Sequence, residues 1–210
     1  MKILHLFYDL LNLYGEYGNL CVLERGLKEK GTEVTVDKLT IGDEIDFSQY
    51  DFIYIGSGTE RNQKVALEYL MPYKEAISEA LNSGKTILAT GNAFEMFGKS
   101  ITDCNKKEYQ ALHIFDFYTE ESDKRTVTDA KSKCKFCEDT LIGFINKASE
   151  IKGIKNSFCE MLEGAGNTAD EKNEGIQEGN FYGTHLIGPL LVRNPALLTF
   201  FVKLLSDNKQ

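Results

Sequence analysis

The fold is decided by one stretch near the middle of the chain, Lys85-Thr-Ile-Leu-Ala-Thr-Gly-Asn-Ala-Phe-Glu-Met-Phe-Gly98. Its apolar first half predicts a buried strand, and the residues that follow predict a tight turn and a short helix. In α/β folds, a turn of this kind holds a catalytic nucleophile toward the substrate. Its apex here is Gly91, so the position has no side chain that can attack a substrate.

Strands and helices alternate on both sides of this stretch. Asn19 is expected to cap the first helix and Gly31 to end it, because glycine adopts left-handed backbone angles at little cost. The alternation predicts a mainly parallel sheet with helices on both faces and with ligands at the carboxyl ends of the strands. The expected strands are 2–8, 33–39, 50–55 and 86–90, and a helical region broken near Pro72 is expected over 62–82.

The second half of the chain changes character. Short β-like runs separated by polar turns predict extra antiparallel strands within the same domain, so residues 1–210 are expected to form a single domain. A C-terminal helix is expected to begin at Pro195 with Asn194 as its N-cap. The polar stretch 167–179 is interpreted as a mobile surface loop. The expected β-like runs are 113–118, 125–130, 140–146 and 157–162.

The composition argues against several classes of protein. A formal net charge of −8 disfavours a nucleic-acid-binding face, because phosphate backbones would be repelled. No apolar run approaches the ~18 residues of a membrane span, and no signal peptide is recognisable, so a cytoplasmic protein is expected. The five cysteines are expected to be reduced thiols rather than a disulfide framework.

One pair of cysteines has a spacing found in metal sites and redox motifs. Cys134-Lys-Phe-Cys137 matches half of a zinc site or a redox dithiol. A closed zinc site needs four ligands, and the other candidates are Cys159, Cys104 and His113. Because a second Cys-x-x-Cys is missing, ordinary packed thiols are the expected interpretation, and neither a metal nor another cofactor is predicted.

Six collinear segments resemble the signatures of cobyric-acid-synthase-like, class I (triad) glutamine amidotransferases. The run Asp9-Leu-Leu-Asn-Leu-Tyr-Gly-Glu-Tyr-Gly-Asn19 resembles the opening signature of the family. The resemblance covers almost the whole chain and is closest to glutaminase subunits of lipid II isoglutaminyl synthases, which amidate peptidoglycan precursors. The other segments are the glycine loop 56–63, the nucleophile turn 88–98, and the stretches 141–146, 164–167 and 183–191.

The resemblance implies a flavodoxin-like, three-layer α/β sandwich and a glutamine-hydrolysing mechanism. In the family, a cysteine thiolate attacks the glutamine side-chain amide, a histidine takes the proton, and backbone N–H groups stabilise the oxyanion. The ammonia passes to a partner, which by family analogy is a Mur-ligase-like synthetase. Carried over by position, the nucleophile falls on Gly91 and the base on Ile187, so both catalytic side chains are absent.

Other positions of the family site are expected to bind a ligand or to shape its pocket. Glu95 replaces a glutamine and places a negative charge where a zwitterionic substrate presents its carboxylate. Arg125 falls near an arginine that holds the substrate in the family, with a surface salt bridge as the alternative role. The expected binding residues are Gly56, Gly58, Arg61, Gln63, Asn92, Glu95, Arg125 and His185.

Three functions remain open from the sequence. The first is a catalytically degenerate subunit that binds or regulates a Mur-ligase-like synthetase in peptidoglycan precursor amidation, with a corrinoid pathway as the alternative setting. The second is an active glutamine-hydrolysing subunit with unconventional residues, although the hydroxyls of Ser57 and Thr59 lack an adjacent base. The third is a small-molecule sensor whose ligand occupies the room left at Gly91, with amino acids, glutamine among them, and nucleotides as the candidates.

Overall fold

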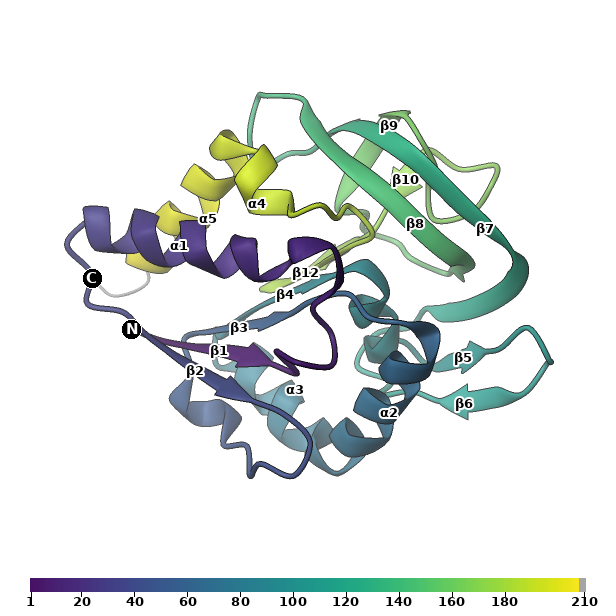
Figure 1. The fold of residues 1–210 in the computed structure, drawn as a ribbon, viewed down its shortest axis with the longest axis horizontal. Helices are drawn as coiled ribbons and strands as arrows, with labels where there is room; N and C mark the ends of the chain where they lie inside the picture. Colours follow the sequence, from purple (N-terminus) through teal and green to yellow (C-terminus); the bar gives the residue numbers. More distant parts are fainter. Residues whose placement is uncertain (208–210) are drawn as a thin grey trace.

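The computed structural model describes residues 1–207, and it confirms an α/β fold with a mainly parallel central sheet (Figure 1). The strands of this sheet are β1 (Lys2–Leu6), β2 (Thr35–Leu39), β3 (Phe52–Ile55), β4 (Thr86–Thr90), β11 (Ile176–Glu178) and β12 (Phe181–Thr184). Their order is β11-β12-β4-β3-β1-β2, and every pair is parallel except β11 with β12. The carboxyl ends of the parallel strands therefore meet at one edge, where the loops that follow converge.

Helices cover both faces of this sheet and give it three layers (Figure 1). The helices are α1 (Tyr17–Glu29), α2 (Glu60–Leu70), α3 (Lys74–Asn82), α4 (Leu190–Arg193) and α5 (Pro195–Asp207), with 3-10 turns η1 (Leu13–Gly15), η2 (Phe47–Gln49), η3 (Met71–Tyr73) and η4 (Gly91–Phe97). In β3, Phe52 and Tyr54 pack with α1 and α5, whereas Ile53 and Ile55 pack with α2 and α3. Both faces are apolar because both are buried.

A second sheet is formed by the second half of the chain. Its strands are β5 (Ser100–Thr102), β6 (Glu108–Gln110), β7 (Tyr118–Lys133), β8 (Leu141–Lys152), β9 (Cys159–Glu163) and β10 (Asn173–Glu174). The order is β10-β9-β7-β5-β6, with β8 paired antiparallel to β7. Phe144 of β8 and Ile187, beyond β12, exchange two backbone hydrogen bonds of 3.2 and 2.9 Å. This bridge fastens the long β7–β8 ribbon beside the carboxyl edge of the first sheet (Figure 1).

The first helix begins earlier than predicted, and Asn19 is not its cap. α1 starts at Tyr17, and the Asn19 side chain is fully buried beneath it. Its amide nitrogen donates to Tyr54 Oη at 2.8 Å, and its amide oxygen accepts from Leu191 N at 2.7 Å. The prediction was wrong because these partners lie far away in the sequence. Gly31 does follow the helix end, with φ +80°.

The C-terminal helix begins at Pro195, as predicted, but the Asn194 side chain does not cap it. Its amide oxygen accepts from Ile142 N at 2.8 Å, and its amide nitrogen donates to Ile142 O at 2.9 Å. Asn194 therefore joins α5 to β8. None of the helices within residues 1–207 is long and apolar enough to cross a membrane.

Two segments of the second half differ from their predictions. The run 113–118 was expected to be a strand, but its residues are irregular until β7 begins at Tyr118. The stretch 167–179 was expected to be a mobile loop, yet it contains β10 and β11, and both Asn167 and Glu174 are buried. Its polar backbone is satisfied by pairing with β9 and β12, which local composition does not reveal.

Candidate functional site

The turn between β4 and η4 has the backbone of a nucleophile elbow but no side chain at its apex. Gly91 has φ +61°, in the left-handed region that disfavours residues with a Cβ atom. The preceding Thr90 points into the fold, where its hydroxyl bonds to the Glu16 carboxylate and to Tyr54 Oη. Burial raises the pKa of Glu16, against the opposing effect of its bonds to Thr90, Tyr54 and the Gly188 amide. Thr90 is therefore not available to the pocket.

The space above Gly91 is occupied by Ser57, from the loop between β3 and α2. A Cβ atom added at Gly91 would overlap both Ser57 Oγ and Ser57 Cβ and would lie 3.2 Å from Ser57 Cα. Ser57 is itself 5% exposed and lines the pocket. The hydroxyl of Ser57 thus lies where the side chain of a residue at position 91 would project.

Hydrogen bonds join the glycine loop to the elbow. Gly58 N donates to the side-chain oxygen of Asn92 at 3.0 Å, and Gln63 Nε2 donates to the backbone oxygen of Asn92 at 2.6 Å. At Gly58, an added Cβ would overlap the Leu11 side chain, so the glycine permits a close approach of two loops. The N–H of Gly58 is therefore already hydrogen-bonded within the protein and is not free to bind an oxyanion.

Glu95 lies in a buried polar network rather than as a free charge in the pocket. It accepts hydrogen bonds from Gln63 Nε2 at 2.8 Å, Ser149 Oγ at 2.7 Å and His185 Nε2 at 2.9 Å. Glu174 lies on the other side of the imidazole, with Oε1 3.3 Å from His185 Nδ1. Burial alone would raise the pKa of both carboxyls, but the hydrogen bonds and charge of His185 outweigh it and lower both pKa values.

The position expected for the base is apolar and buried. Ile187 is 1% exposed and is held by the backbone bridge to Phe144. His185, two residues earlier, is turned toward Glu95 and Glu174 and is 2% exposed. The imidazole of His185 is therefore buried beside two carboxylates and does not line the pocket.

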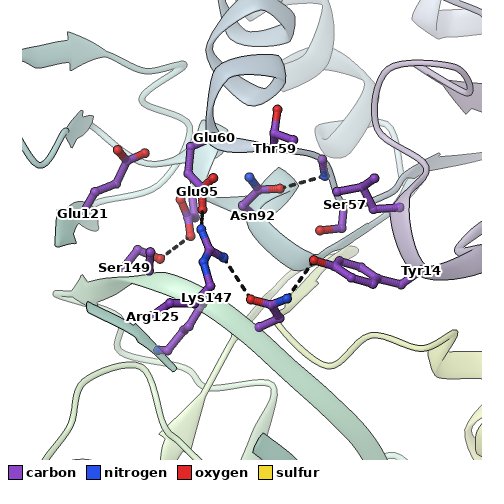
Figure 2. A pocket seen from close by; sticks show the side chains of 14 residues that line it. Tyr14, Ser57, Thr59, Glu60, Asn92, Glu95, Glu121, Arg125, Lys147 and Ser149 are labelled. Atoms are coloured by element: carbon purple, nitrogen blue, oxygen red, sulfur yellow. Dashed lines mark hydrogen bonds and ion pairs between the residues drawn. The ribbon is translucent and has the colours of Figure 1, made fainter. Parts of the chain in front are cut away.

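A cavity of about 220 Å³ lies at the meeting point of these elements (Figure 2). Arg125 of β7 lines the cavity and donates to Glu60 and, at 2.9 Å, to Asn146 Oδ1. Asn146 Nδ2 in turn donates to Tyr14 Oη at 2.8 Å. The Lys147 amine donates to two backbone carbonyls at 2.5 and 3.0 Å, and burial lowers its pKa. The pocket thus has a polar lining with charges of both signs.

Several of these residues were missed by the sequence analysis. Along β8, the odd-numbered positions form the buried face, which begins with apolar Leu141 and Ile145 and continues with Lys147 and Ser149. A lysine and a serine on an otherwise buried face are the signal that could have identified them. Tyr14 had no comparable signal, because its contact with Asn146 joins residues far apart in the chain.

The comparison with protein families agrees with this architecture. The model of the CobB/CobQ-like glutamine amidotransferase domain matches residues 2–195. The chain belongs to this family.

Two curated relatives of this CobB/CobQ-like domain are both named lipid II isoglutaminyl synthase (glutamine-hydrolyzing) subunit GatD. The protein from Staphylococcus aureus strain N315 is 29% identical over 209 residues, which are 100% of this chain and 86% of the relative. The protein from Streptococcus pneumoniae strain R6 is 27% identical over 200 residues, which are 94% of this chain and 77% of the relative. These relatives confirm the resemblance that the sequence motifs indicated.

Two solved structures with the same fold are a PurLQS chain and a glutaminase domain. A chain of the PurLQS structure from Thermotoga maritima has a TM-score of 0.67 at 13% identity, with 100% of this chain and 99% of that chain covered. The glutaminase domain of Trypanosoma brucei CTPS with bound acivicin has a TM-score of 0.60 at 9% identity, with 99% and 94% covered. At these identities the likeness establishes the fold alone.

Within this amidotransferase-like fold, not every predicted site residue reaches the pocket. Gln63, Asn92, Glu95 and His185 meet at or beneath it. Gly58 and Arg125 lie in its lining, whereas the exposed Arg61 lines a separate groove between α2 and the β5–β6 hairpin. Gly56 packs under the pocket, where an added Cβ would lie 2.5 Å from Leu11 O.

The cysteines lie apart from the amidotransferase-like pocket. Cys134 and Cys137 face each other with 3.7 Å between their sulfurs. Cys159 is buried, and its thiol donates to Glu174 Oε2 at 3.6 Å. Within residues 1–207, no group of three or more histidine, cysteine, aspartate or glutamate side chains is placed to hold a metal ion.

Proposed function

We propose that this chain is a non-catalytic, glutamine amidotransferase-like subunit that binds and regulates a Mur-ligase-like synthetase in the amidation of peptidoglycan precursors. The observation that carries this proposal is the occupied reaction centre: Ser57 fills the space above Gly91, and a buried Ile187 takes the position of the base. Both relatives are named as subunits of a synthase, which supports a role within a complex.

The chemistry of the remaining side chains supports the loss of turnover. A serine hydroxyl needs an adjacent base to become a nucleophile. Ser57 has no hydrogen bond to an imidazole or carboxylate among the described residues, and His185 is engaged by Glu95 and Glu174. The Asn92 side chain also occupies the N–H of Gly58. Attack thus lacks an activated nucleophile, proton transfer lacks a base, and the oxyanion lacks the N–H donor of Gly58.

Ammonia release from glutamine tests the catalytic part of the proposal. With glutamine as substrate, the purified chain, alone or with a co-expressed Mur-ligase-like synthetase, is expected to release ammonia no faster than glutamine in buffer without protein. The matched control is the Ser57→Ala variant, which removes the hydroxyl nearest the vacant position. Release that exceeds buffer and disappears in Ser57→Ala would favour an active subunit with unconventional residues.

Co-purification tests the partner part independently. A tagged chain is expected to retain a co-expressed Mur-ligase-like synthetase through gel filtration and to change its amidation rate when ammonia is supplied directly. Absence of a complex would refute the partner assignment without affecting the catalytic argument. A complex with no change of rate would refute regulation and leave only binding.

A second candidate function is supported by the pocket itself. Its cavity of about 220 Å³ is lined by Ser57, Asn92 and Arg125, a set that suits the amide and charged groups of a small amino acid. This sensor would bind glutamine or a similar amino acid without reacting. A thermal-shift series with single amino acids is expected to show a concentration-dependent rise of Tm. No rise with any amino acid at millimolar concentration would exclude the sensor.

A further inference from the structure

The two cysteines of the Cys-x-x-Cys motif lie on the turn that joins β7 to β8, outside the pocket. Residues 135–136 form the turn between them, and a β-turn brings its ends to within about 7 Å. Disulfides span Cα separations of up to about 7 Å. The sulfur atoms lie 3.7 Å apart, compared with about 2.0 Å in an S–S bond, so the two thiols are already neighbours.

We propose that Cys134 and Cys137 form a reversible intramolecular disulfide by exchange with a low-molecular-weight disulfide of the glutathione class. Both thiols are partly exposed, so a small disulfide reaches them without unfolding of the chain. The pair plays no part in the function proposed above, and the two proposals stand or fall separately.

The exchange balances in two steps. The thiolate of Cys134 attacks one sulfur of the small disulfide, and the first small thiolate leaves. Cys137 then loses its proton to solvent, its thiolate attacks the Cys134 sulfur, and the second small thiolate leaves. One small disulfide is reduced to two thiols while the protein dithiol is oxidised.

The order of these steps follows from the surroundings of the two sulfurs. Burial and the neighbouring Cys134 raise the pKa of Cys137, so little Cys137 thiolate is present while Cys134 is a free thiol. The part of this shift that comes from Cys134 disappears once Cys134 is in the mixed disulfide. Cys137 is therefore suited to the second, resolving step.

The other cysteines are less suited to form such a bond. Cys159 is buried beside Glu174, and burial raises its pKa well above the usual value. Cys21 on α1 and Cys104 between β5 and β6 are exposed, and neither has a sulfur–sulfur contact among the described residues. An oxidant is thus expected to link one pair and to leave mixed disulfides at most on Cys21 and Cys104.

The disulfide would hold in place the turn that carries Phe136, whose ring packs against other aromatic rings. Phe136 lies between the cysteines in the chain, and its ring centroid is 5.5 Å from that of Phe158, 5.4 Å from Tyr182 and 5.0 Å from Phe200. Phe158 directly precedes β9 of the second sheet, Tyr182 belongs to β12, and Phe200 belongs to α5. Closing the turn should stabilise this contact and raise Tm by roughly 4 to 8 °C, as expected for a very short loop.

Equilibration of the full chain in reduced and oxidised glutathione mixtures tests the proposal. Oxidised protein is expected to lose the two thiols of the motif, beyond any mixed disulfides on Cys21 and Cys104, and peptide mapping is expected to link Cys134 to Cys137. Cys134→Ser and Cys137→Ser should each abolish the link and the rise of Tm, whereas Cys21→Ser should retain both. A link from Cys134 to Cys159, or mixed disulfides alone at the motif, would overturn the proposal. A correct link without a rise of Tm would overturn its stabilising consequence.

Discussion

Adding a side chain at Gly91 should destabilise the protein far more than the same change at an unobstructed glycine of similar backbone angle. Gly91 has φ +61°, and the left-handed region costs a non-glycine residue about 1 to 2 kcal/mol. The added Cβ would also overlap Ser57, and overpacking a rigid interior costs about 1 to 3 kcal/mol. Gly91→Ala is therefore expected to lower the free energy of unfolding by roughly 2 to 5 kcal/mol.

Gly31→Ala is the matched control for the backbone term. Gly31 has φ +80°, and a Cβ added there would meet nothing within 4 Å. This variant should therefore lose only the left-handed cost of about 1 to 2 kcal/mol. The difference between the two alanine variants isolates the overlap with Ser57.

A double-mutant cycle then assigns that overlap to one side chain. Ser57→Gly should recover about 1 to 3 kcal/mol in the Gly91→Ala background while costing about 1 kcal/mol on its own. Urea denaturation followed by circular dichroism measures all four free energies of unfolding. The reasoning is refuted if Gly91→Ala costs no more than Gly31→Ala, or if the two changes add within about 0.5 kcal/mol.

The remaining predictions concern titration and the rim of the pocket. Burial lowers the pKa of His5 from 6.5 to about 4. As the pH falls, the unfolded chain therefore binds a proton at this residue before the folded chain does. The free energy of unfolding should fall by about 2 kcal/mol from pH 7 to pH 5. A titration of Tm should show this slope, and His5→Phe should flatten it. Glu95 has a lowered pKa in the folded protein. Its ionised form should therefore stabilise the fold above the unfolded pKa of 4.5, and this stabilisation should be lost as the pH falls through the lower folded pKa. Glu95→Gln should cost about 1.5 to 3 kcal/mol at pH 7 in urea denaturation, because a charged hydrogen bond to His185 is weakened; an unchanged midpoint would contradict this. Arg125→Ala should change stability by less than about 1 kcal/mol, because its ion pair with Glu60 is exposed, yet it should abolish any amino-acid-dependent thermal shift.

The elements around the first sheet were predictable because their signals are local. Apolar runs bounded by polar loops gave β1, β3 and β4, and the break at Pro72 separates α2 from α3 as expected. The apex at Gly91 was likewise found from the order of strand, turn and helix. Each of these features depends on residues within a few positions of one another.

The contents of the site were not predictable, because they depend on residues brought together by the fold. Glu95 was expected to present a charge to the ligand, but Ser149 reaches it from β8 and His185 from the segment beyond β12. The overlap of Ser57 with position 91 likewise joins two different loops. The surroundings of His5 in β1 also come from the fold: both its ring nitrogens lack hydrogen-bond partners among the described residues, and its ring stacks on Tyr17.

The missing side chain at Gly91 thus leaves no free space for a thiol. A cysteine at this position would need the Ser57 side chain removed, since the two occupy the same space. Even then, its thiolate would have no base, because Ile187 is apolar and the imidazole of His185 is held between two carboxylates with lowered pKa values. Reorienting that imidazole would leave the buried Glu95 carboxylate without one of its hydrogen bonds, at a cost of about 1.5 to 3 kcal/mol. Under the proposed non-catalytic role, the hydrogen-bond network that stabilises the fold therefore also opposes glutamine hydrolysis, and single substitutions at Gly91 or Ile187 should not confer it.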